Sequence, residues 1–346
     1  MRLDKMKNWR PPAHWMKITT VDVHIEGEPL RIITGGFPDL PGKTILARRH
    51  HIRERLDHLR MTLMWEPRGH REMYGCILTP PVSPGADIGV LFMHNEGYST
   101  GCGHGIIGLT TAVLETGMMH MEEPETTLRI DTPAGPVTAH AQVSDRRVKS
   151  VRFHNVPSFV VALDESVDVP GLGKVRYDLA FGGAFYAYVE AKQVGLTCSQ
   201  EEVHSLVEKG MAIKRAVMDS QPLAHPFEKD LNFLYGTIFI APSKTAETDS
   251  CNVCIFADGQ VDRSPTGTGV SGRLAIHHAR GEISINQPMI IESIIGSRFI
   301  GRIIKVTTFG PYDAVVAEVE GRAHITGRHE FLLDPDDPLM HGFILS

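Results

Sequence analysis

Gly101-Cys102-Gly103-His104-Gly105 and Pro265-Thr266-Gly267-Thr268-Gly269 are two versions of one short pattern. Each is followed by an apolar run, residues 106–114 and residues 270–278. A Gly-rich turn before such a run predicts a helix that begins in the turn and is buried on most sides. The decisive difference between the copies is Cys102 in the first and Thr266 in the second. A Cys thiol can ionise and act as a base near neutral pH, whereas a Thr hydroxyl cannot.

The surroundings of the two turns are also repeated. Residues 88–93 and residues 252–257 are short apolar runs that predict buried strands. A polar loop follows each strand, over residues 94–100 and 258–264, and leads into the turn. Strand, loop, turn and helix therefore occur twice. This order predicts an internal duplication, with two similar α/β halves and a cleft between them.

The remaining sequence suggests where the halves begin and end. Residues 20–34 predict two strands with a turn, and residues 43–59 and 191–218 predict helices. Residues 157–174 contain many turn-forming residues and indicate a boundary. We expect a first half of residues 18–156 joined by the C-terminal residues 326–346, a second half of residues 157–325, and an N-terminal tail of residues 1–17.

Composition narrows the class of protein. The 346 residues are 42% hydrophobic and 22% charged, which is typical of a globular protein with a core. The net charge of -6 does not favour nucleic acid or an anionic membrane as a partner. No apolar run approaches the roughly 20 residues of a membrane span, and the N-terminus lacks a signal-peptide core. Five cysteines do not indicate a disulfide framework, so we expect a cytoplasmic protein.

The two turns predict a site for a small anion. A helix N-terminus presents unpaired N–H groups and the positive end of the helix dipole, and it binds carboxylates without a cationic side chain. The same field is expected to lower the pKa of Cys102 from about 8.5 toward neutrality. A thiolate beside a bound carboxylate is suited to removing the Cα proton of an amino acid.

Two other motifs resemble a dinucleotide site and a metal site, but neither has the sequence context that such a site requires. Residues 103–108 and 267–272 both fit G-x-G-x-x-G, but a dinucleotide site needs a strand immediately before the first Gly. Cys251 and Cys254 form a C-x-x-C without a second ligand pair, in a strand where positions three apart face opposite ways. We therefore expect neither a Rossmann site nor a metal site.

Longer motifs resemble those of a known family. Ser99-Thr-Gly-Cys-Gly-His-Gly105 and Asp262-Arg-Ser-Pro-Thr-Gly-Thr-Gly269 are similar to the paired signatures of the proline racemase family, over about residues 20–343. The resemblance implies a diaminopimelate-epimerase-like fold, α/β with two pseudo-symmetric halves, each a sheet or barrel around a central buried helix. It also implies a homodimer that acts on a cyclic amino acid without PLP, metal or other cofactor.

The resemblance also implies roles for single residues. Cys102 matches the catalytic Cys of the family, and Gly103 and His104 match its first carboxylate-binding turn. Gly267 and Thr268 match the second such turn, Asp262 matches the acidic residue that contacts the ring nitrogen, and Thr266 stands where racemases have their second Cys.

The Cys/Thr pair resembles the branch of the family that dehydrates trans-3-hydroxy-L-proline. In that substrate the Cα hydrogen and the 3-hydroxyl lie on one ring face, so a single thiol on that face is sufficient. The product is Δ2-pyrroline-2-carboxylate, which tautomerises to the Δ1 imine. Either Cys102 or His104 is expected to return a proton to the departing hydroxyl.

Other readings stay open at this point. A proline racemase or hydroxyproline 2-epimerase would need an acid or base at Thr266. A non-catalytic relative that binds imino acids or a protein would not need Cys102. Asp262 could simply cap a turn, His104 could be structural, and Thr268 could be only an N-cap.

Overall fold

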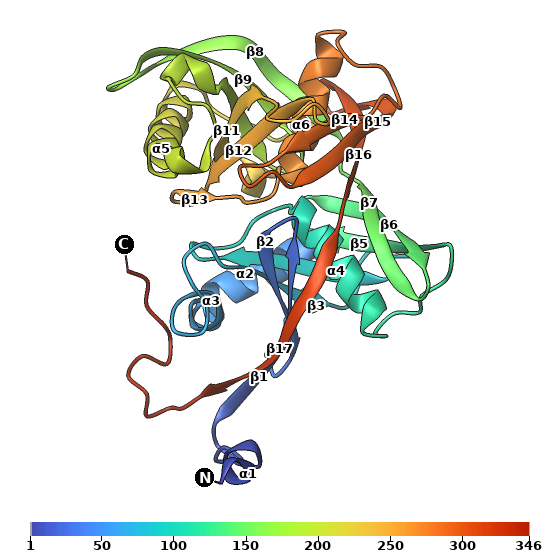
Figure 1. Ribbon diagram of the computed structural model, residues 1–346, viewed down its shortest axis with the longest axis vertical. Helices are drawn as coiled ribbons and strands as arrows, with labels where there is room; N and C mark the ends of the chain where they lie inside the picture. Colours follow the sequence, from blue (N-terminus) through green and yellow to red (C-terminus); the bar gives the residue numbers. More distant parts are fainter. Residues whose placement is uncertain (1, 346) are drawn as a thin grey trace.

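The computed structural model describes residues 2–345 of the protein. Two halves are stacked along its long axis, and in each a strongly curved sheet surrounds one helix (Figure 1). This arrangement confirms the expected α/β class with two similar halves. It follows from the two apolar helices, which have no polar face and must be covered by a sheet on all sides.

The first half is a mixed sheet, with both antiparallel and parallel pairs, and two helices lie on its outside. Its strands are β1 (Met16–Ile25), β2 (Glu28–Gly35), β3 (Tyr74–Thr79), β4 (Ile88–His94), β5 (Glu125–Thr132), β6 (Gly135–Ser144), β7 (Arg147–His154) and β17 (Ala323–Leu333). Helices α2 (Ile45–Arg55) and α3 (Asp57–Met64) connect β2 to β3, and α4 (Gly103–Glu115) is the central helix.

The second half is a closed barrel. Its strands pair in the order β8, β9, β10, β11, β12, β14, β15 and β16, and β16 pairs with β8 again. Their bounds are β8 (Ser158–Val169), β9 (Gly173–Phe181), β10 (Phe185–Glu190), β11 (Leu234–Pro242), β12 (Ser250–Phe256), β14 (Met289–Glu292), β15 (Arg298–Phe309) and β16 (Tyr312–Gly321). Helix α5 (Val203–Ser220) connects β10 to β11, and α6 (Gly267–Ala279) is the central helix.

The two halves share one pattern of strand pairing. In the first half β2 pairs with β3, and β4 with β5, in parallel. In the second half β10 with β11, and β12 with β14, are the parallel pairs in the same places. Each central helix lies on the connection between the strands of the second parallel pair. The duplication predicted from the two Gly-rich turns therefore extends through the whole topology.

Apolar side chains of both central helices form much of the core. Ile107 and Leu109 of α4 are fully buried, and so are Val270 and Leu274 of α6. At about 1.5–3 kcal/mol for each large apolar side chain removed from water, this burial accounts for two helices that have no solvent-facing side. A smaller cluster of apolar residues lies under α2 and α3.

Three segments differ from the sequence-based expectation. Residues 158–169 and 173–181 form a long hairpin, although segment 157–174 is rich in turn-forming residues, because pairing between β8 and β9 outweighs the local turn propensity. The helix expected over 43–59 is interrupted at Leu56, where φ is -128°. The helix expected over 191–218 begins only at Val203, because Gly195 takes a left-handed conformation after η1 (Ala191–Val194).

Short elements complete the chain. The segment expected to be a tail contains α1 (Leu3–Lys7), and the rings of Trp9 and Trp15 pack edge to face with centroids 6.0 Å apart. The other short elements are η2 (Gln200–Glu202), η3 (Lys229–Leu231) and β13 (Gln260–Val261). No helix within residues 2–345 has the length and apolar character needed to cross a membrane.

The chain crosses between the halves twice. The first crossing follows β7, and the second joins β16 to β17, which pairs with β1 along its length (Figure 1). The expected division after residue 156 lies between β7 and β8, and that after residue 325 lies within β17. We propose these two positions as the boundaries of the halves.

Candidate active site at the two helix N-termini

Cys102 is the N-cap residue of α4, immediately before its first residue, Gly103. Its backbone is extended, with φ -149°, and its Sγ accepts the N–H of Gly105 at 3.1 Å. Both ring nitrogens of His104 lie 3.4 Å from the same sulfur. The thiol is only 6% exposed. Local structure therefore places a buried sulfur at the positive end of α4, in contact with an imidazole.

Thr266 holds the equivalent N-cap position of α6, with a different geometry. Its φ is 65°, an unusual value for a β-branched residue, and its side chain does not cap the helix. Instead Oγ1 donates a hydrogen bond to Asp262 Oδ2 at 2.8 Å, while the N–H of Ser264 donates to Asp262 Oδ1 at 2.8 Å. The Asp262 carboxylate thus organises the loop before α6 and holds the Thr266 hydroxyl.

Two glycines bring the helix N-termini together. A Cβ atom on Gly103 would lie 2.6 Å from the Cα of Gly267, and a Cβ on Gly267 would lie 2.9 Å from the Cα of Gly103. Both distances are too short for any side chain, so this backbone contact requires glycine on each side. The halves are further joined by Thr100 Oγ1, which donates to the carbonyl of Gly183 at 2.9 Å.

One small cavity lies where the helix N-termini meet. All seven residues named from the sequence line it, which are Cys102, Gly103, His104, Asp262, Thr266, Gly267 and Thr268. Its volume is about 20 Å³, room for one water molecule. The first N–H groups of a helix have no partner within that helix, so two sets of such donors converge here. The arrangement is suited to a carboxylate group.

The expected lowering of the Cys102 pKa is wrong for this closed cavity. Burial raises the pKa of the Cys102 thiol well above its usual value, and the Gly105 N–H and the Tyr74 hydroxyl oppose that shift only in part. Burial also lowers the pKa of His104, with Asp262 opposing it. Desolvation outweighs the helix field because a charge here has almost no water around it. Cys102 and His104 are therefore a neutral pair.

Sequence reasoning missed the aromatic wall of the cavity. Tyr74 begins β3, Tyr186 lies in β10, Tyr235 lies in β11, and Phe256 ends β12. The Tyr74 ring packs edge to face on His104 with centroids 4.7 Å apart, and the Tyr186 hydroxyl bonds Thr268 Oγ1 at 2.7 Å. These strands carry no motif. The only sequence feature that could have indicated these cavity residues is the presence of aromatic residues near the ends of strands.

The two cysteines of the C-x-x-C lie on opposite faces of β12, as the strand pattern predicts. Cys254 lines the cavity near Thr266 and Asp262, and burial raises the pKa of its thiol. Cys251 instead contacts Cys198. No sequence pattern indicated that Cys254 belongs to the site, since a lone Cys is usually a small buried apolar residue.

Glu28 connects the two halves. This fully buried carboxylate on β2 accepts the N–H of Arg263 at 2.8 Å and lies 3.5 Å from its guanidinium. Arg263 also pairs with Glu72. Burial raises the pKa of Glu28, and the charge of nearby Asp262 adds to the rise. The loop that carries Asp262 is thus fixed to the first half.

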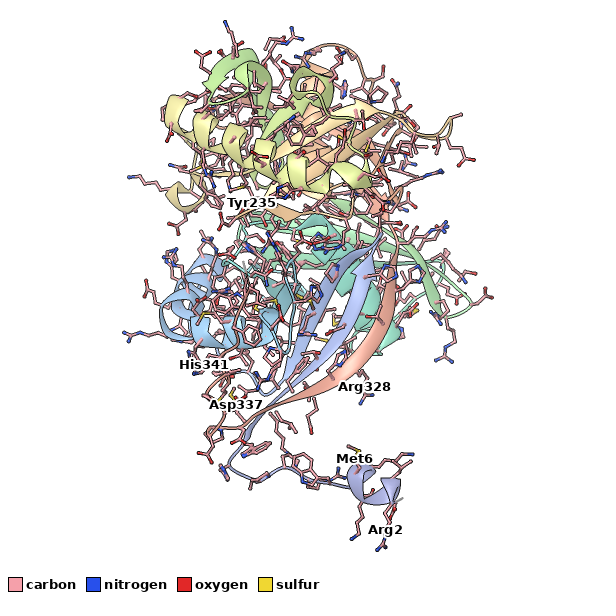
Figure 2. All side chains as sticks on the ribbon, turned by 60° about the vertical axis from the view of Figure 1, so that its left-hand side comes forward. Arg2, Met6, Tyr235, Arg328, Asp337 and His341 are labelled. Carbon is pink, nitrogen blue, oxygen red and sulfur yellow. The ribbon has the colours of Figure 1, made fainter. Side chains whose placement is uncertain are left out.

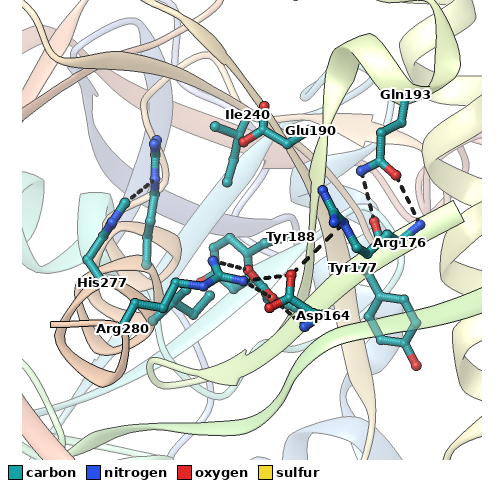
Figure 3. A pocket seen from close by; sticks show the side chains of 12 residues that line it. Asp164, Arg176, Tyr177, Tyr188, Glu190, Gln193, Ile240, His277 and Arg280 are labelled. Carbon is teal, nitrogen blue, oxygen red and sulfur yellow. Dashed lines mark hydrogen bonds and ion pairs between the residues drawn. The ribbon is translucent and has the colours of Figure 1, made fainter. Parts of the chain in front are cut away.

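A second cavity, of about 260 Å³, lies at the opposite end of α6 (Figure 3). The Arg280 guanidinium pairs there with Asp178 at 2.8 Å and with Asp164 at 3.1 Å. The side chain of Gln193 bonds the backbone of Arg176 through both its amide atoms. These groups satisfy one another, so we assign this cavity no chemistry.

The fold and the site together define a diaminopimelate-epimerase-like protein, in which two opposed helix N-termini enclose the site. The pattern of the proline racemase family matches residues 20–344. The chain belongs to this family.

Several curated proteins are similar to this chain over nearly its whole length. A trans-3-hydroxy-L-proline dehydratase of Colwellia psychrerythraea is 45% identical over 99% of this chain and 97% of its own. A protein of the same name from Bacillus cereus is 47% identical over 95% of this chain and 98% of its own. A 3-hydroxyproline 2-epimerase of Burkholderia multivorans is 45% identical over the same shares.

Solved structures agree with the fold. A hydroxyproline epimerase from Agrobacterium vitis, with bound trans-4-hydroxy-L-proline, superimposes with a TM-score of 0.91 at 35% identity, over 96% of each chain. A PhzF-family protein of Bacillus anthracis superimposes with a TM-score of 0.56 at 13% identity, over 91% of this chain and 99% of its own. The second likeness concerns the fold alone.

Proposed function

We propose that the protein dehydrates trans-3-hydroxy-L-proline to Δ2-pyrroline-2-carboxylate and water, and that the enamine tautomerises to Δ1-pyrroline-2-carboxylate. The observation that carries the proposal is the asymmetry of the two turns. One turn holds a thiol against an imidazole, and the other holds a Thr hydroxyl bonded to a carboxylate. The dehydratase names of two relatives at 45% and 47% identity support the same reaction.

The substrate carboxylate is placed at the two helix N-termini. Gly103 and His104 supply N–H donors from α4, and Gly267 and Thr268 supply donors from α6. These donors also stabilise the negative charge that develops when the Cα proton leaves. Asp262 accepts the ring N–H in this arrangement, next to the hydroxyl of Thr266.

Cys102 is the base that removes the Cα proton. Because its thiol is neutral in the closed cavity, it must first release its own proton. His104 has both ring nitrogens 3.4 Å from the sulfur and is the neighbouring group that passes this proton on to solvent. The thiolate then takes the Cα proton, the C–H electrons form the ring double bond, and the C3–O bond breaks with its electron pair on the oxygen, which takes up a proton and leaves as water. Thr266 is not required to move a proton.

The test is proton NMR in D2O with three substrates, which are trans-3-hydroxy-L-proline, trans-4-hydroxy-L-proline and L-proline. We expect the 3-hydroxy compound alone to be consumed, with the pyrroline imine as product, and we expect no consumption with Cys102→Ser. A cis-4-hydroxy-D-proline signal, or D-proline found in the same samples by chiral chromatography, would instead show an isomerase with a second acid other than Thr266.

A 2-epimerase is the second candidate, because one relative at 45% identity carries that name. Inverted 3-hydroxyproline in the same spectra would identify it. We further propose that the protein is a cytoplasmic homodimer. Size-exclusion chromatography with light scattering tests the dimer.

A further inference from the structure

Tyr235 has a hydroxyl that the rest of the site leaves unused. Its side chain lines the cavity, is 7% exposed, and has no hydrogen-bond partner for Oη within residues 2–345. A buried hydroxyl without a partner is energetically costly, so an unpaired one inside a ligand cavity indicates a polar group on the ligand. The ring itself is held by stacking on Phe256, with centroids 5.3 Å apart.

The position of this hydroxyl relative to Cys102 is informative. Tyr235 belongs to the second half but lies at the junction with the first, where Figure 2 labels it. Its Oη lies beside the hydroxyls of Tyr74 and Ser99, which bond each other. The Tyr74 hydroxyl is in turn beside the Cys102 sulfur. Tyr235 therefore approaches the cavity from the side of the base.

A group on the side of the base is also on the side of the leaving hydroxyl. In trans-3-hydroxy-L-proline the Cα hydrogen and the 3-hydroxyl share one ring face, so the base and the acid for this reaction must stand together. His104 contacts the Cys102 sulfur with both ring nitrogens, whereas the Tyr235 hydroxyl has no hydrogen-bond partner in good geometry and only lies near the Tyr74 and Ser99 hydroxyls. Burial raises the pKa of Tyr235, so the phenol keeps its proton.

We propose that Tyr235 binds the 3-hydroxyl of the substrate and donates the proton with which it leaves as water. This inference rests on the proposed dehydration and names the acid for it.

The proton balance closes within named groups. Cys102 thiolate takes the Cα proton, the C–H pair becomes the ring double bond, and the C3–O pair leaves with oxygen. That oxygen takes the phenolic proton and departs as water. The Cys102 thiol then returns its proton to the Tyr235 phenolate through the Tyr74 hydroxyl, so the thiolate is restored.

The experiment compares Tyr235→Phe with wild type in D2O, using trans-3-hydroxy-L-proline and proton NMR. We expect dehydration to fall about 100-fold or more, the usual effect of losing a general acid. Deuterium should still enter the Cα position of recovered substrate, because Cys102 still removes that proton. Binding of pyrrole-2-carboxylate, a planar ring without a 3-hydroxyl, should be unchanged and shows that the variant is folded.

Tyr177→Phe is the matched control. Its hydroxyl bonds Gln221 at 3.0 Å, outside the active-site cavity, so the same change there should leave dehydration unaltered. Dehydration by Tyr235→Phe close to the wild-type rate would overturn the inference. So would loss of both dehydration and deuterium exchange with inhibitor binding intact, because Tyr235 would then act on proton removal. Absence of dehydration by the wild-type protein would instead refute the proposed function itself.

Discussion

The N-termini of α4 and α6 occupy equivalent places but are built differently. At α4 an extended Cys102 caps the helix with its own sulfur, which is free to contact His104. At α6 a left-handed Thr266 turns its hydroxyl away from the helix and donates it to Asp262. The helix end that keeps a reactive group presents it to a neighbouring proton acceptor. The other presents a hydroxyl whose proton is already engaged.

The comparison predicts unequal effects of serine at the two positions. Cys102→Ser should lower dehydration about 10⁴-fold, because a serine hydroxyl is a very weak base, although serine caps a helix well and the fold should persist. Thr266→Ser keeps the hydroxyl and should lower the rate less than about tenfold. Initial rates for the two purified variants measure this. Equal losses would show that the two turns do equivalent chemistry.

The pH dependence of kcat/KM tests whether Cys102 and His104, at the N-terminus of α4, are uncharged near neutral pH. Burial raises the pKa of Cys102, so the reactive thiolate becomes more abundant as pH rises. We expect kcat/KM to increase roughly tenfold per pH unit through neutrality, as for a single ionisation. Burial lowers the pKa of His104, so its imidazole is already uncharged in this pH range and should not cause a second rise in kcat/KM. A flat profile between pH 6 and about 8 would contradict a raised thiol pKa.

The sequence was sufficient for the parts of the site that lie on consecutive residues. Cys102 and Thr266 are marked by glycines and by the apolar helices that follow, so their meeting could be inferred from the duplication. Tyr74 and Tyr235 come from strands with no motif, and their approach depends on how β3 and β11 are curved. Long-range pairing of this kind is not encoded in a local pattern.

The distinction between local sequence patterns and long-range contacts also explains which sequence-based expectations were wrong. Residues 157–174 were expected to be rich in turns because the local residues favour them, but pairing between β8 and β9 makes most of them strands. The pKa of Cys102 was expected to fall because the helix field can be seen in the sequence. The sequence does not show that Cys102 is only 6% exposed, and the effect of this burial on the thiol pKa is larger than that of the helix field.

Restoring a thiol to α6 should sharpen the comparison. Thr266→Cys places a second acid or base opposite Cys102, so we expect D-proline to appear from L-proline, which the wild-type protein should not produce. Dehydration should fall by about tenfold, because a thiol is a weaker hydrogen-bond donor to Asp262 than a hydroxyl is. Chiral chromatography measures both products. If no D-proline forms, the left-handed backbone at residue 266, rather than the side chain, prevents inversion.

Glycine at the contact between the helices is where the two turns are alike, and here the smallest effects are expected. In Gly103→Ala the new Cβ would lie 2.6 Å from a backbone atom of Gly267, and no side-chain rotation can relieve that overlap. We expect the free energy of unfolding to fall by about 1–3 kcal/mol.

Gly267→Ala should cost a similar amount, because its Cβ would lie 2.9 Å from the Cα of Gly103. Gly97→Ala is the control, since nothing lies within 4 Å of its Cβ position, and it should change stability by less than about 0.5 kcal/mol. Urea denaturation measures all three. Similar midpoints for Gly103→Ala and Gly97→Ala would show that the helix N-termini can separate without cost. In that case their asymmetric chemistry would not depend on the symmetric contact that now holds them together.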